Sequence, residues 1–399
     1  MREGWKEVEF GEIVEFPPKV KLRKSEKYPF IPMEEINERY KYVYPKIKKE
    51  LSSGGAKFEE GDTLFSRITP CLQNGKIAQA KNLNNSPGFG STEYFVFRGI
   101  ENLTDSDFIY YLSITEEFRK NAINSMVGAS GRQRADAGHI KKFKFLLPPL
   151  ETQRKIAKIL SNYDDLIENN LKRIKILEEM AQQTYEEWFV RMRFPGHESA
   201  TINPETGLPE GWEKVKLGEV CNFSQGLQVP IEKQFTQFSN ELIRFIRIVD
   251  VTQNTNDIRY IESPKSLNQF VHFKDVFMVR YGAPQVVTNY HGIIANNFFR
   301  ININDENKLK RKFLFSFLNR NEIKENLLAM SVSATMPAIS FKSFSTLDII
   351  LPEIEVHAKF HKYVDTTYDL ILNLQNQNQR LREARDILLP RLMMGMVEV

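Results

Sequence analysis

The stretch GWKEVEFGEIVEF (residues 4–16) returns as GWEKVKLGEVCNF (residues 211–223), and this repeat decides how the chain is organised. Glycine, tryptophan, valine, glycine, glutamate and phenylalanine keep the same columns in both copies, whereas the charged positions between them vary. Such variation is typical of the exposed face of a strand. Self-similarity over so long a period indicates an ancestral duplication, so we expect two similar domains.

A second repeated landmark opens each of two long amphipathic segments. FKFLLPPLETQ (residues 143–153) and LDIILPEIEVH (residues 347–357) are β-rich runs interrupted by proline, and a seam that steps by threes and fours follows each. The first seam contains Ile156, Leu160, Tyr163, Ile167, Ile174, Leu177 and Trp188, and the second contains Phe360, Val364, Ile371, Leu374, Leu381, Leu388 and Leu392. Arg385 fits the second seam poorly, and we expect the neighbouring Ala384 to take its place.

The two seams predict long helices. Glycine and proline are absent until Pro195 and Pro390, so each helix can run for about 35 to 40 residues, or ~50–60 Å. A helix of that length with one apolar stripe needs a partner, and similar halves are usually related by a two-fold. We therefore expect an antiparallel coiled-coil pair. Two separate helices, each packed on its own domain, are the alternative.

The regions between these landmarks, residues 17–142 and 224–346, are rich in short β-like runs with turns and a few helices. KFEEGDTLFSRITPCLQNGKIAQA (residues 57–80) predicts a turn, a strand, a polar loop and a second strand, and residues 270–294 have the same rhythm. Asp105 and Asp107 are expected to cap a following helix. The fold class predicted is α+β, with two β-rich domains in a pseudo-two-fold repeat separated by the two long helices.

Composition narrows the class of protein without identifying it. Hydrophobic residues at 41% and charged residues at 27% are ordinary for a globular protein, and no apolar run approaches the ~20 residues of a membrane span. The first residues lack the apolar core of a signal peptide, so we expect a cytoplasmic protein. Cys71 and Cys221 are far apart and are interpreted as buried small apolar residues. The formal charge of +4 suits a polyanionic partner but does not require one.

Taken together, these motifs resemble the specificity subunit of type I restriction-modification systems. The resemblance covers nearly the whole chain and is carried by the tryptophan-containing openings, by GDTLFSRITPCLQNGKIA (residues 61–78) with STEYFVFRG (residues 91–99), and by residues 130–160 leading into the first helix. The second half matches more loosely. It has DVFMVRYGAP (residues 275–284) in place of the usual Gly-Asp strand, and LPEIEVH where the family generally has Leu-Pro-Pro-Leu and a glutamine.

The resemblance implies a division into target-recognition domains and spacer helices. The implied segments are target-recognition domain 1 at residues 1–150, spacer helix 1 at 151–195, a linker at 196–210, target-recognition domain 2 at 211–353 and spacer helix 2 at 354–399. It implies binding to double-stranded DNA and to two methyltransferase subunits, which would carry out N6-adenine methylation with S-adenosylmethionine. Whether a restriction subunit with ATP-dependent cleavage also binds is left open, and this chain itself would hold no cofactor.

Motifs for chemistry within this chain are missing. An adenine methyltransferase needs an Asn- or Asp-Pro-Pro-aromatic motif and a glycine-rich cofactor loop, and the sequence contains neither, nor a phosphate-binding Walker loop. Glu59, Glu60 and Asp62 are interpreted as a polar turn before a strand. His357 and His361 share a helix face, as zinc ligands can, but they lack a third ligand, so we predict a solvated face and no metal. The sequence therefore predicts a non-catalytic subunit.

Polar residues in the matched loops are the candidates for contact with DNA. Base readout favours arginine on guanine, and asparagine or glutamine on adenine, although most protein–DNA hydrogen bonds go to phosphate and sugar. The candidates are Ser66, Arg67, Gln73, Asn74, Ser91, Thr92, Glu93, Arg132, Gln133 and Arg134 in the first half, and Arg280, Tyr281, Gln285, Asn289, Asn296, Asn297 and Thr335 in the second.

Two basic runs supply further candidates, this time for neutralising phosphates. They are Lys19, Lys21, Arg23, Lys24, Lys46, Lys48 and Lys49 in the first half, and Lys308, Lys310, Arg311 and Lys312 in the second. Charge runs of this kind are equally typical of solvated surfaces. The competing hypothesis for the whole chain is an interaction scaffold whose paired helices bind proteins and whose globular halves bind something other than DNA.

Overall fold

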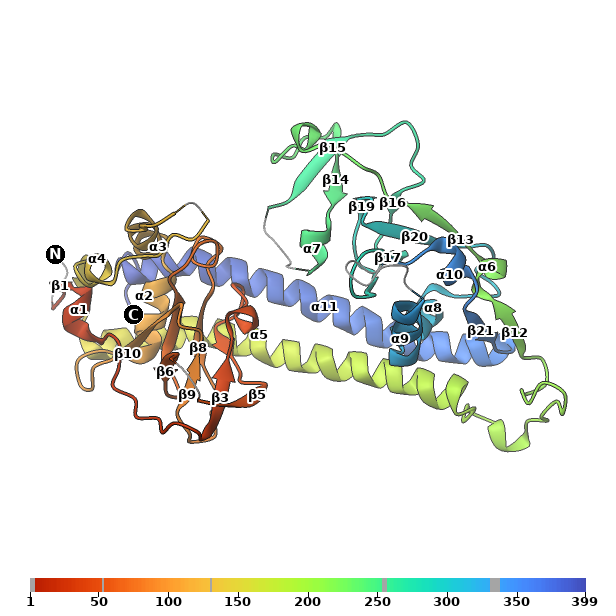
Figure 1. The fold of residues 1–399 in the computed structure, drawn as a ribbon, viewed down its shortest axis with the longest axis horizontal. Coiled ribbons are helices and arrows are strands. Elements are labelled where there is room, and N and C mark those ends of the chain that lie inside the picture. Colours follow the sequence, from red (N-terminus) through yellow and green to blue (C-terminus); the bar gives the residue numbers. More distant parts are fainter. Residues whose placement is uncertain (1–3, 52–53, 130, 253–256, 331–337) are drawn as a thin grey trace. The chain divides into compact units, whose positions relative to one another are not determined.

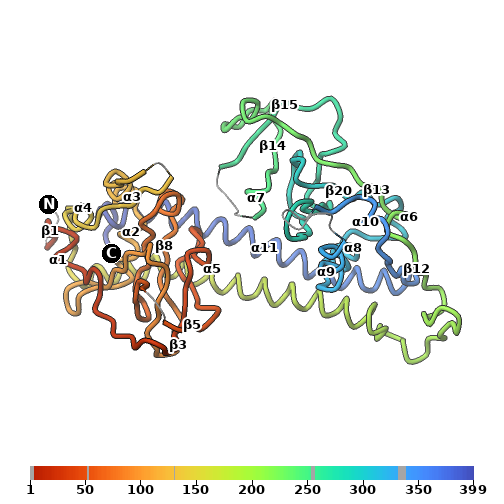
Figure 2. The backbone as a smooth tube through the Cα atoms, viewed as in Figure 1, coloured from red at the N-terminus to blue at the C-terminus, as the bar shows by residue number. Residues whose placement is uncertain are grey.

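The computed structural model describes residues 4–51, 54–129, 131–252, 257–330 and 338–399. The chain forms two compact units. Unit 1 comprises Met1–Arg173 and Asn373–Val399, and unit 2 comprises Ile174–Leu372 (Figure 1). Both units mix helices and strands, which confirms the predicted α+β class. Both chain ends belong to unit 1 (Figure 2).

Unit 1 places two sheets beside short helices. Its elements up to the first long helix are β1 (Lys6–Glu9), α1 (Phe10–Ile13), β2 (Val14–Glu15), β3 (Lys27–Ile31), the 3-10 turn η1 (Met33–Glu35), β4 (Tyr42–Val43), β5 (Ile47–Glu50), β6 (Ala56–Phe58), β7 (Thr63–Ser66), β8 (Ile77–Ala80), β9 (Gly88–Gly90), β10 (Tyr94–Gly99), α2 (Ser106–Ile114), α3 (Glu116–Asn124), α4 (Ala137–Lys141) and β11 (Lys144–Leu147). The sheets have the orders β2-β10-β7-β8-β4 and β5-β3-β9-β6, and β1 pairs separately with β11.

Unit 2 repeats this plan. Its elements are a π-helical turn η2 (Glu186–Val190), the 3-10 turn η3 (His197–Ser199), β12 (Glu213–Lys216), α6 (Leu217–Val220), β13 (Cys221–Gln225), η4 (Ile231–Lys233), β14 (Leu242–Ile246), α7 (Ile248–Thr252), β15 (Arg259–Glu262), β16 (Phe270–Val271), β17 (Val276–Val279), β18 (Val286–Val287), β19 (Gly292–Ile294), β20 (Phe298–Ile303), α8 (Arg311–Asn319), α9 (Asn321–Ala329), α10 (Phe341–Ser345) and β21 (Asp348–Leu351). Its sheets have the orders β13-β20-β17-β18 and β15-β14-β19-β16, and β12 pairs with β21.

Strand pairing makes the duplication explicit. The tryptophan-containing openings form β1 and β12, and each pairs antiparallel with the strand that precedes a long helix. In the second sheet of each unit one parallel pair occurs at the same place, between β3 and β9 and between β14 and β19. The repeat read from the sequence is therefore a repeat of sheet topology.

Side-chain caps explain where several short helices begin. Asp105 accepts a hydrogen bond from the backbone of Phe108 at the start of α2, as predicted, because its carboxylate satisfies a free N–H of the first turn. Asp107 has a different role, since it binds Nζ of the fully buried Lys41 at 2.8 Å. Asp136 and Ser340 cap α4 and α10 in the same way as Asp105.

The two predicted long helices are α5 (Leu150–Tyr185) and α11 (Ile354–Met393). Both contribute residues to both units. Within unit 1 they run antiparallel, because Asp164 binds Arg385 and Asn170 binds Asn378. Within unit 2 the ring of Phe360 on α11 contacts Tyr185 at the end of α5 and Trp188 in the π-helical turn that follows it.

Most of the predicted seam is buried. Ile156, Leu160, Ile167, Ile174, Phe360, Val364, Ile371, Leu374 and Leu392 are at most 8% exposed, whereas Tyr163, Leu177, Trp188, Leu381 and Leu388 are partly buried. At the end of α5, the side chains of Tyr185 and Phe189 are more deeply buried than Trp188. The π-helical turn that follows Tyr185 changes the spacing there, which a regular pattern of threes and fours does not anticipate.

Two details of the helices differ from the prediction. Arg385, and not Ala384, occupies the seam of α11: Arg385 is 6% exposed because Asp164 provides a counterion. Pro390 does not end the helix, which continues to Met393. The buried side chains of Leu389, Leu392 and Met393 hold this last turn in place despite the hydrogen bond that proline removes.

Each unit has its own core. In unit 1 the largest hydrophobic cluster joins aromatic side chains of the sheet and α2 to the start of α5 and the end of α11. In unit 2 the corresponding cluster joins β17, β20 and α8 to the other ends of the same helices. Cys221 is buried, as predicted, but Cys71 is only partly buried, and both thiols are free. No helix in the described parts of the chain is long and apolar enough to cross a membrane.

Candidate nucleic-acid interface

Two arginines occupy equivalent positions at the ends of equivalent strands. Arg67 follows β7, and its backbone N–H donates to the carbonyl of Glu93 while its own carbonyl accepts from Ala135. Arg280 follows β17 and makes the same pair of backbone hydrogen bonds, with Asn297 and Ile339. In each unit three chain segments that are distant in sequence therefore meet at one strand end.

Both arginine side chains lie over aromatic rings. The guanidinium carbon of Arg67 is 4.5 Å from the ring centre of Phe95, and that of Arg280 is 5.2 Å from the ring centre of Tyr281. In both residues Nε is buried and has no hydrogen-bond partner among the described residues. Stacking fixes the plane of a guanidinium and leaves its edge free for a bidentate contact, so either arginine is suited to a guanine edge or a phosphate.

In unit 1 a charged pair joins two of the predicted loops. Nε and Nη2 of Arg134 donate to the carboxylate of Glu93 at 2.9 and 2.6 Å. This hydrogen bond raises the pKa of the exposed Arg134. The backbone of Gln133 also binds that of Thr69. The structure therefore brings Arg67, Glu93, Gln133 and Arg134 together.

The other candidates of the first half differ in exposure. Gln73, Asn74, Thr92 and Arg132 are exposed, and Ser91 is partly buried. Ser66 is fully buried within β7, and its hydroxyl has no partner in the described part of the chain, so we do not retain it as a residue that contacts DNA directly.

In unit 2 some of the candidates lie at the strand end that Arg280 occupies. Asn296 and Asn297 lie in the turn before β20 and are partly buried, whereas Gln285 and Asn289 are exposed. Asn289 has a positive φ of 66° and hydrogen-bonds through its backbone to Phe273, away from Arg280. Thr335 lies outside the described residues.

Some residues of the two basic runs are exposed, and others form ion pairs within the protein. Lys19, Lys21, Arg23, Lys24, Lys48 and Lys49 are exposed, and Lys46 pairs with Glu35. In unit 2 Arg311 pairs with Asp275 and Glu306, and Lys312 pairs with Asp365. The second basic run therefore serves the fold of unit 2 at two of its four positions.

An ion pair with a buried aspartate lies at the start of β7 and of β17, at the opposite end of each strand from Arg67 and Arg280, and sequence reasoning did not identify it. Arg98 binds Asp62 through two hydrogen bonds of 2.7 Å, and this contact raises the pKa of Arg98. In unit 2 Asp275 similarly binds Arg300 at 2.8 Å. The sequence signal was an aspartate immediately before each strand, in GDTLF and KDVFM.

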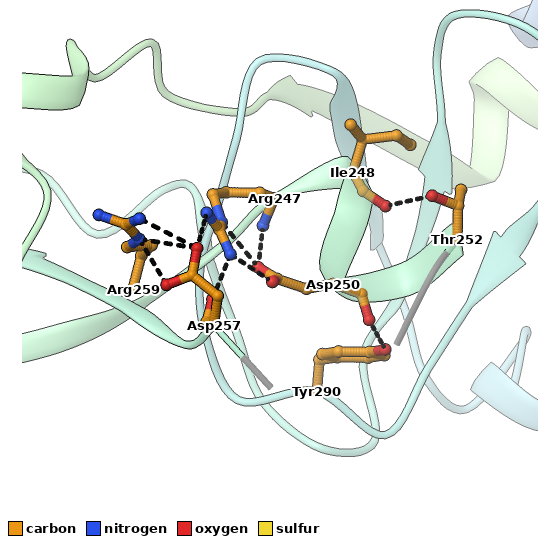
Figure 3. Close-up of polar contacts among 7 residues, drawn as sticks. All are labelled: Arg247, Ile248, Asp250, Thr252, Asp257, Arg259 and Tyr290. Atoms are coloured by element: carbon orange, nitrogen blue, oxygen red, sulfur yellow. Dashed lines mark hydrogen bonds and ion pairs between the residues drawn. The ribbon is translucent and has the colours of Figure 1, made fainter. Parts of the chain in front are cut away.

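A second polar cluster stands on the other sheet of unit 2 (Figure 3). Arg247 binds Asp250 at 2.9 Å and Asp257 at 3.1 Å, and Arg259 also binds Asp257. Burial lowers the pKa of Arg247, but the hydrogen bonds and charges of Asp250 and Asp257 outweigh this effect and hold the pKa above its ordinary value. The hydroxyl of Tyr290 donates to the carbonyl of Asp250. This cluster fixes α7 and β15 and was missed, because a sequence does not show which charges meet across a loop.

The histidine pair is not a solvated helix face. His357 is 2% exposed and packs edge-on against Phe313, with 4.8 Å between ring centres. Burial lowers its pKa to about 4. His361 is partly buried and binds Asp365 at 2.6 Å. The described residues contain no group of three or more His, Cys, Asp or Glu side chains arranged to hold a metal ion.

The comparison with known proteins agrees with this architecture. A family model described as "Type I restriction modification DNA specificity domain" matches residues 2–179 and 209–382. The MjaIX type I specificity subunit of Methanocaldococcus jannaschii is 26% identical over 90% of this chain and 84% of its own length. The HindI specificity subunit of Haemophilus influenzae is 24% identical over 90% and 92%, respectively. The S subunit structure from M. genitalium has the same fold, with a TM-score of 0.52 and 14% identity over 98% of this chain and 96% of its own.

This chain belongs to the type I restriction-modification specificity family, with one copy of the family domain in each half. The predicted resemblance is therefore confirmed. Specificity subunits are the DNA-recognition component of these systems and not the catalytic one, in agreement with the missing methyltransferase motifs.

Proposed function

We propose that this chain reads a bipartite DNA sequence, with one half-site bound at the strand ends around Arg67 and the other at those around Arg280. The observation that carries the proposal is the equivalence of these two sites: the same strand end, the same two backbone hydrogen bonds and a stacked guanidinium in each unit. A duplicated site suits a target made of two short half-sites.

The residues we assign to DNA contact are the candidates near these strand ends that the structure leaves exposed or partly exposed. They are Arg67, Gln73, Asn74, Ser91, Thr92, Glu93, Arg132, Gln133 and Arg134 in unit 1, and Arg280, Tyr281, Gln285, Asn296 and Asn297 in unit 2. Lys19, Lys21, Arg23 and Lys24 add charge for phosphates. Within this set, the two arginines have the best-defined geometry for reading guanine.

We assign to the long helices the role of setting the distance between the two half-sites. The division proposed from the sequence assigns residues 1–150 and 211–353 to target recognition, 151–195 and 354–399 to the spacer helices, and 196–210 to the linker. We further propose that two methyltransferase subunits assemble with this chain and use S-adenosylmethionine. ATP is used only by a restriction subunit, where one is present. The complex works in the cytoplasm, where its DNA target is accessible.

Retention of DNA by the purified chain, alone and with its methyltransferase, tests the proposal. Affinity should fall steeply with salt, because cationic side chains that bind phosphates release counterions. Arg67→Ala and Arg280→Ala should each reduce specific binding by about 10- to 100-fold, the range expected for a bidentate guanine contact. Lys158→Ala, an exposed lysine of α5, is the matched control and should leave binding unchanged.

The scaffold hypothesis predicts a different result. In that case the chain would capture proteins through its helices, DNA retention would be weak, and neither arginine variant would alter it. Family membership favours DNA recognition over the scaffold.

A further inference from the structure

Unit 1 contains a hollow beside Arg67 for which the proposed function has no use. Its volume is about 480 Å³, large enough for a nucleotide. It is lined in part by the rings of Phe16 and Phe95 and by the side chains of Lys57, Arg67, Thr92 and Lys141. Arg67 and Thr92 place it next to the residues assigned to DNA contact.

The lining is positively charged. Three of the described lining residues are cationic and none is acidic. Lys141 lies over the ring of Phe16, with Nζ 5.3 Å from the ring centre, and Arg67 lies over Phe95. Aromatic faces combined with cations are the surface that unpaired nucleotides prefer, because the rings stack on bases and the cations attract phosphate.

One buried polar atom of a lining residue has no partner among the described residues. Nε of Arg67 makes no hydrogen bond, although Arg67 lines the hollow. Buried polar atoms are almost always paired in folded proteins. An unpaired guanidinium nitrogen beside the hollow indicates that a ligand with hydrogen-bond acceptors completes the site.

Unit 2 shows what fits this place. By the repeat, Ala137 at the start of α4 corresponds to Phe341 at the start of α10. The ring of Phe341 stacks on Phe223, the counterpart of Phe16, at 6.1 Å and 26°. It also packs against Phe299, the counterpart of Phe95, and lies under the guanidinium of Arg280 at 5.5 Å. In unit 1 alanine leaves that space open, and Ala137 lines the hollow.

We propose that the hollow of unit 1 receives a single nucleotide, whose base takes the place that the ring of Phe341 fills in unit 2. The inference rests on the proposed function, because the nucleotide comes from the bound DNA. It is turned out of the duplex at the first half-site. The base stacks on Phe16, its edge faces the guanidinium of Arg67, and its phosphates face Lys57 and Lys141. Stacking and hydrogen bonding in the hollow offset the cost of leaving the duplex.

The test fills the hollow with a phenylalanine ring at residue 137, as Phe341 fills the equivalent place in unit 2. Duplexes that carry the methylated target, with 2-aminopurine at each position of the first half-site in turn, are bound by the full chain alone and with its methyltransferase. One position other than the methylated base should show a several-fold rise in fluorescence, since unstacking relieves quenching. Ala137→Phe should abolish that rise, whereas Ala137→Ser, which leaves the space open, should keep it. An unchanged signal in Ala137→Phe, or no rise at any position, would overturn the proposal for a DNA nucleotide.

A second variant guards against misfolding of Ala137→Phe, whose melting temperature is measured in parallel. Lys141→Gln removes one positive charge from the lining and should reduce the fluorescence rise, because a phosphate in the hollow loses its counterion. Lys158→Gln, which changes an exposed lysine outside the hollow, is the control. A rise that Lys141→Gln leaves as high as in the unmodified chain would contradict the assigned contact.

Calorimetric titration with deoxynucleoside monophosphates tests whether the hollow binds a free nucleotide instead of one that belongs to the DNA. Saturable binding that Ala137→Phe removes, without any change in 2-aminopurine fluorescence, would show a site for free nucleotides and overturn the extruded base. The proposed function fails separately, if the chain does not retain DNA at all. If the chain retains DNA but shows neither an unstacked base nor nucleotide binding, the proposal for the hollow is wrong and the proposed function stands.

Discussion

Asn170 of α5 donates a hydrogen bond from Nδ2 to Oδ1 of Asn378 on α11, at 2.9 Å, within the mostly apolar seam. Both amides are buried, at 7% and 3% exposure. With the offset of 204 residues between the helices, the positions that correspond to them are Leu374 and Ile174, both apolar. The polar pair therefore breaks the pseudo-symmetry of the seam, and a slide of either helix would leave two buried amides unpaired.

Replacing one member of this pair should destabilise unit 1 more than replacing both. Asn170→Leu leaves the amide of Asn378 buried without a partner, which costs about 1–3 kcal/mol. The double variant with Asn378→Leu removes both amides and should recover most of that loss. Urea denaturation of both single variants and the double gives the coupling. A double variant whose loss equals the sum of the single losses would show that the amides do not depend on each other.

His357 should make the stability of unit 2 depend on pH. Its pKa is about 4 in the fold against an ordinary 6.5, so protonation favours the unfolded chain. The stabilisation is complete above pH 6.5 and is lost as the pH falls towards 4, by about 3 kcal/mol at most. Urea midpoints between pH 7 and 4 should fall less steeply for His357→Leu than for the unmodified chain. His361→Gln is the control, and a slope in His357→Leu that matches the unmodified chain would refute the assignment.

Lengthening the helices should change the gap in the recognised sequence. Four residues inserted after Leu171, with four more after Gln375, add ~6 Å and little more than one turn to each helix, so each seam keeps its face. We expect a gap altered by about two base pairs with the same half-site bases. Two inserted residues rotate the seam by about 200° and should abolish activity. Methylome sequencing of cells carrying each variant decides between these outcomes, and an unaltered gap with full activity in both would exclude the helices as the spacer.

The purified chain should neither bind S-adenosylmethionine nor transfer a methyl group. The physical reason is the missing motif for holding a target amine beside a methyl donor. Isothermal titration with the cofactor should show no saturable heat, and the same titration with the methyltransferase subunit present is the positive control. Saturable binding by the chain alone would contradict the prediction.

The repeated elements were the predictable part of the fold. The tryptophan openings, the proline-terminated strands and the two seams each follow from a local pattern with a period of two or about 3.6 residues. Long-range polar contacts were not predictable in this way. Arg385 looks misplaced in a seam until Asp164 is seen opposite it, and His357 looks solvated until Phe313 is seen against it.

The candidate site was predicted as a set of loops and not as a geometry. The sequence placed Arg67 and Arg280 in matched loops, but their stacking on Phe95 and Tyr281 depends on the sheet. Ser66 illustrates the limit. One residue earlier than Arg67, it points to the opposite face of the strand and is buried, and the polarity of a serine does not reveal on which side it lies.

Exchange of one recognition region tests the central claim most directly. Residues 17–142 are replaced by the equivalent region of a relative with a different target, and the methylated sequences are read by methylome sequencing. If each unit reads its own half-site, one half of the methylated sequence should change to that of the relative while the other half and the gap stay the same. A change in both halves, or in neither, would contradict independent recognition by two duplicated units.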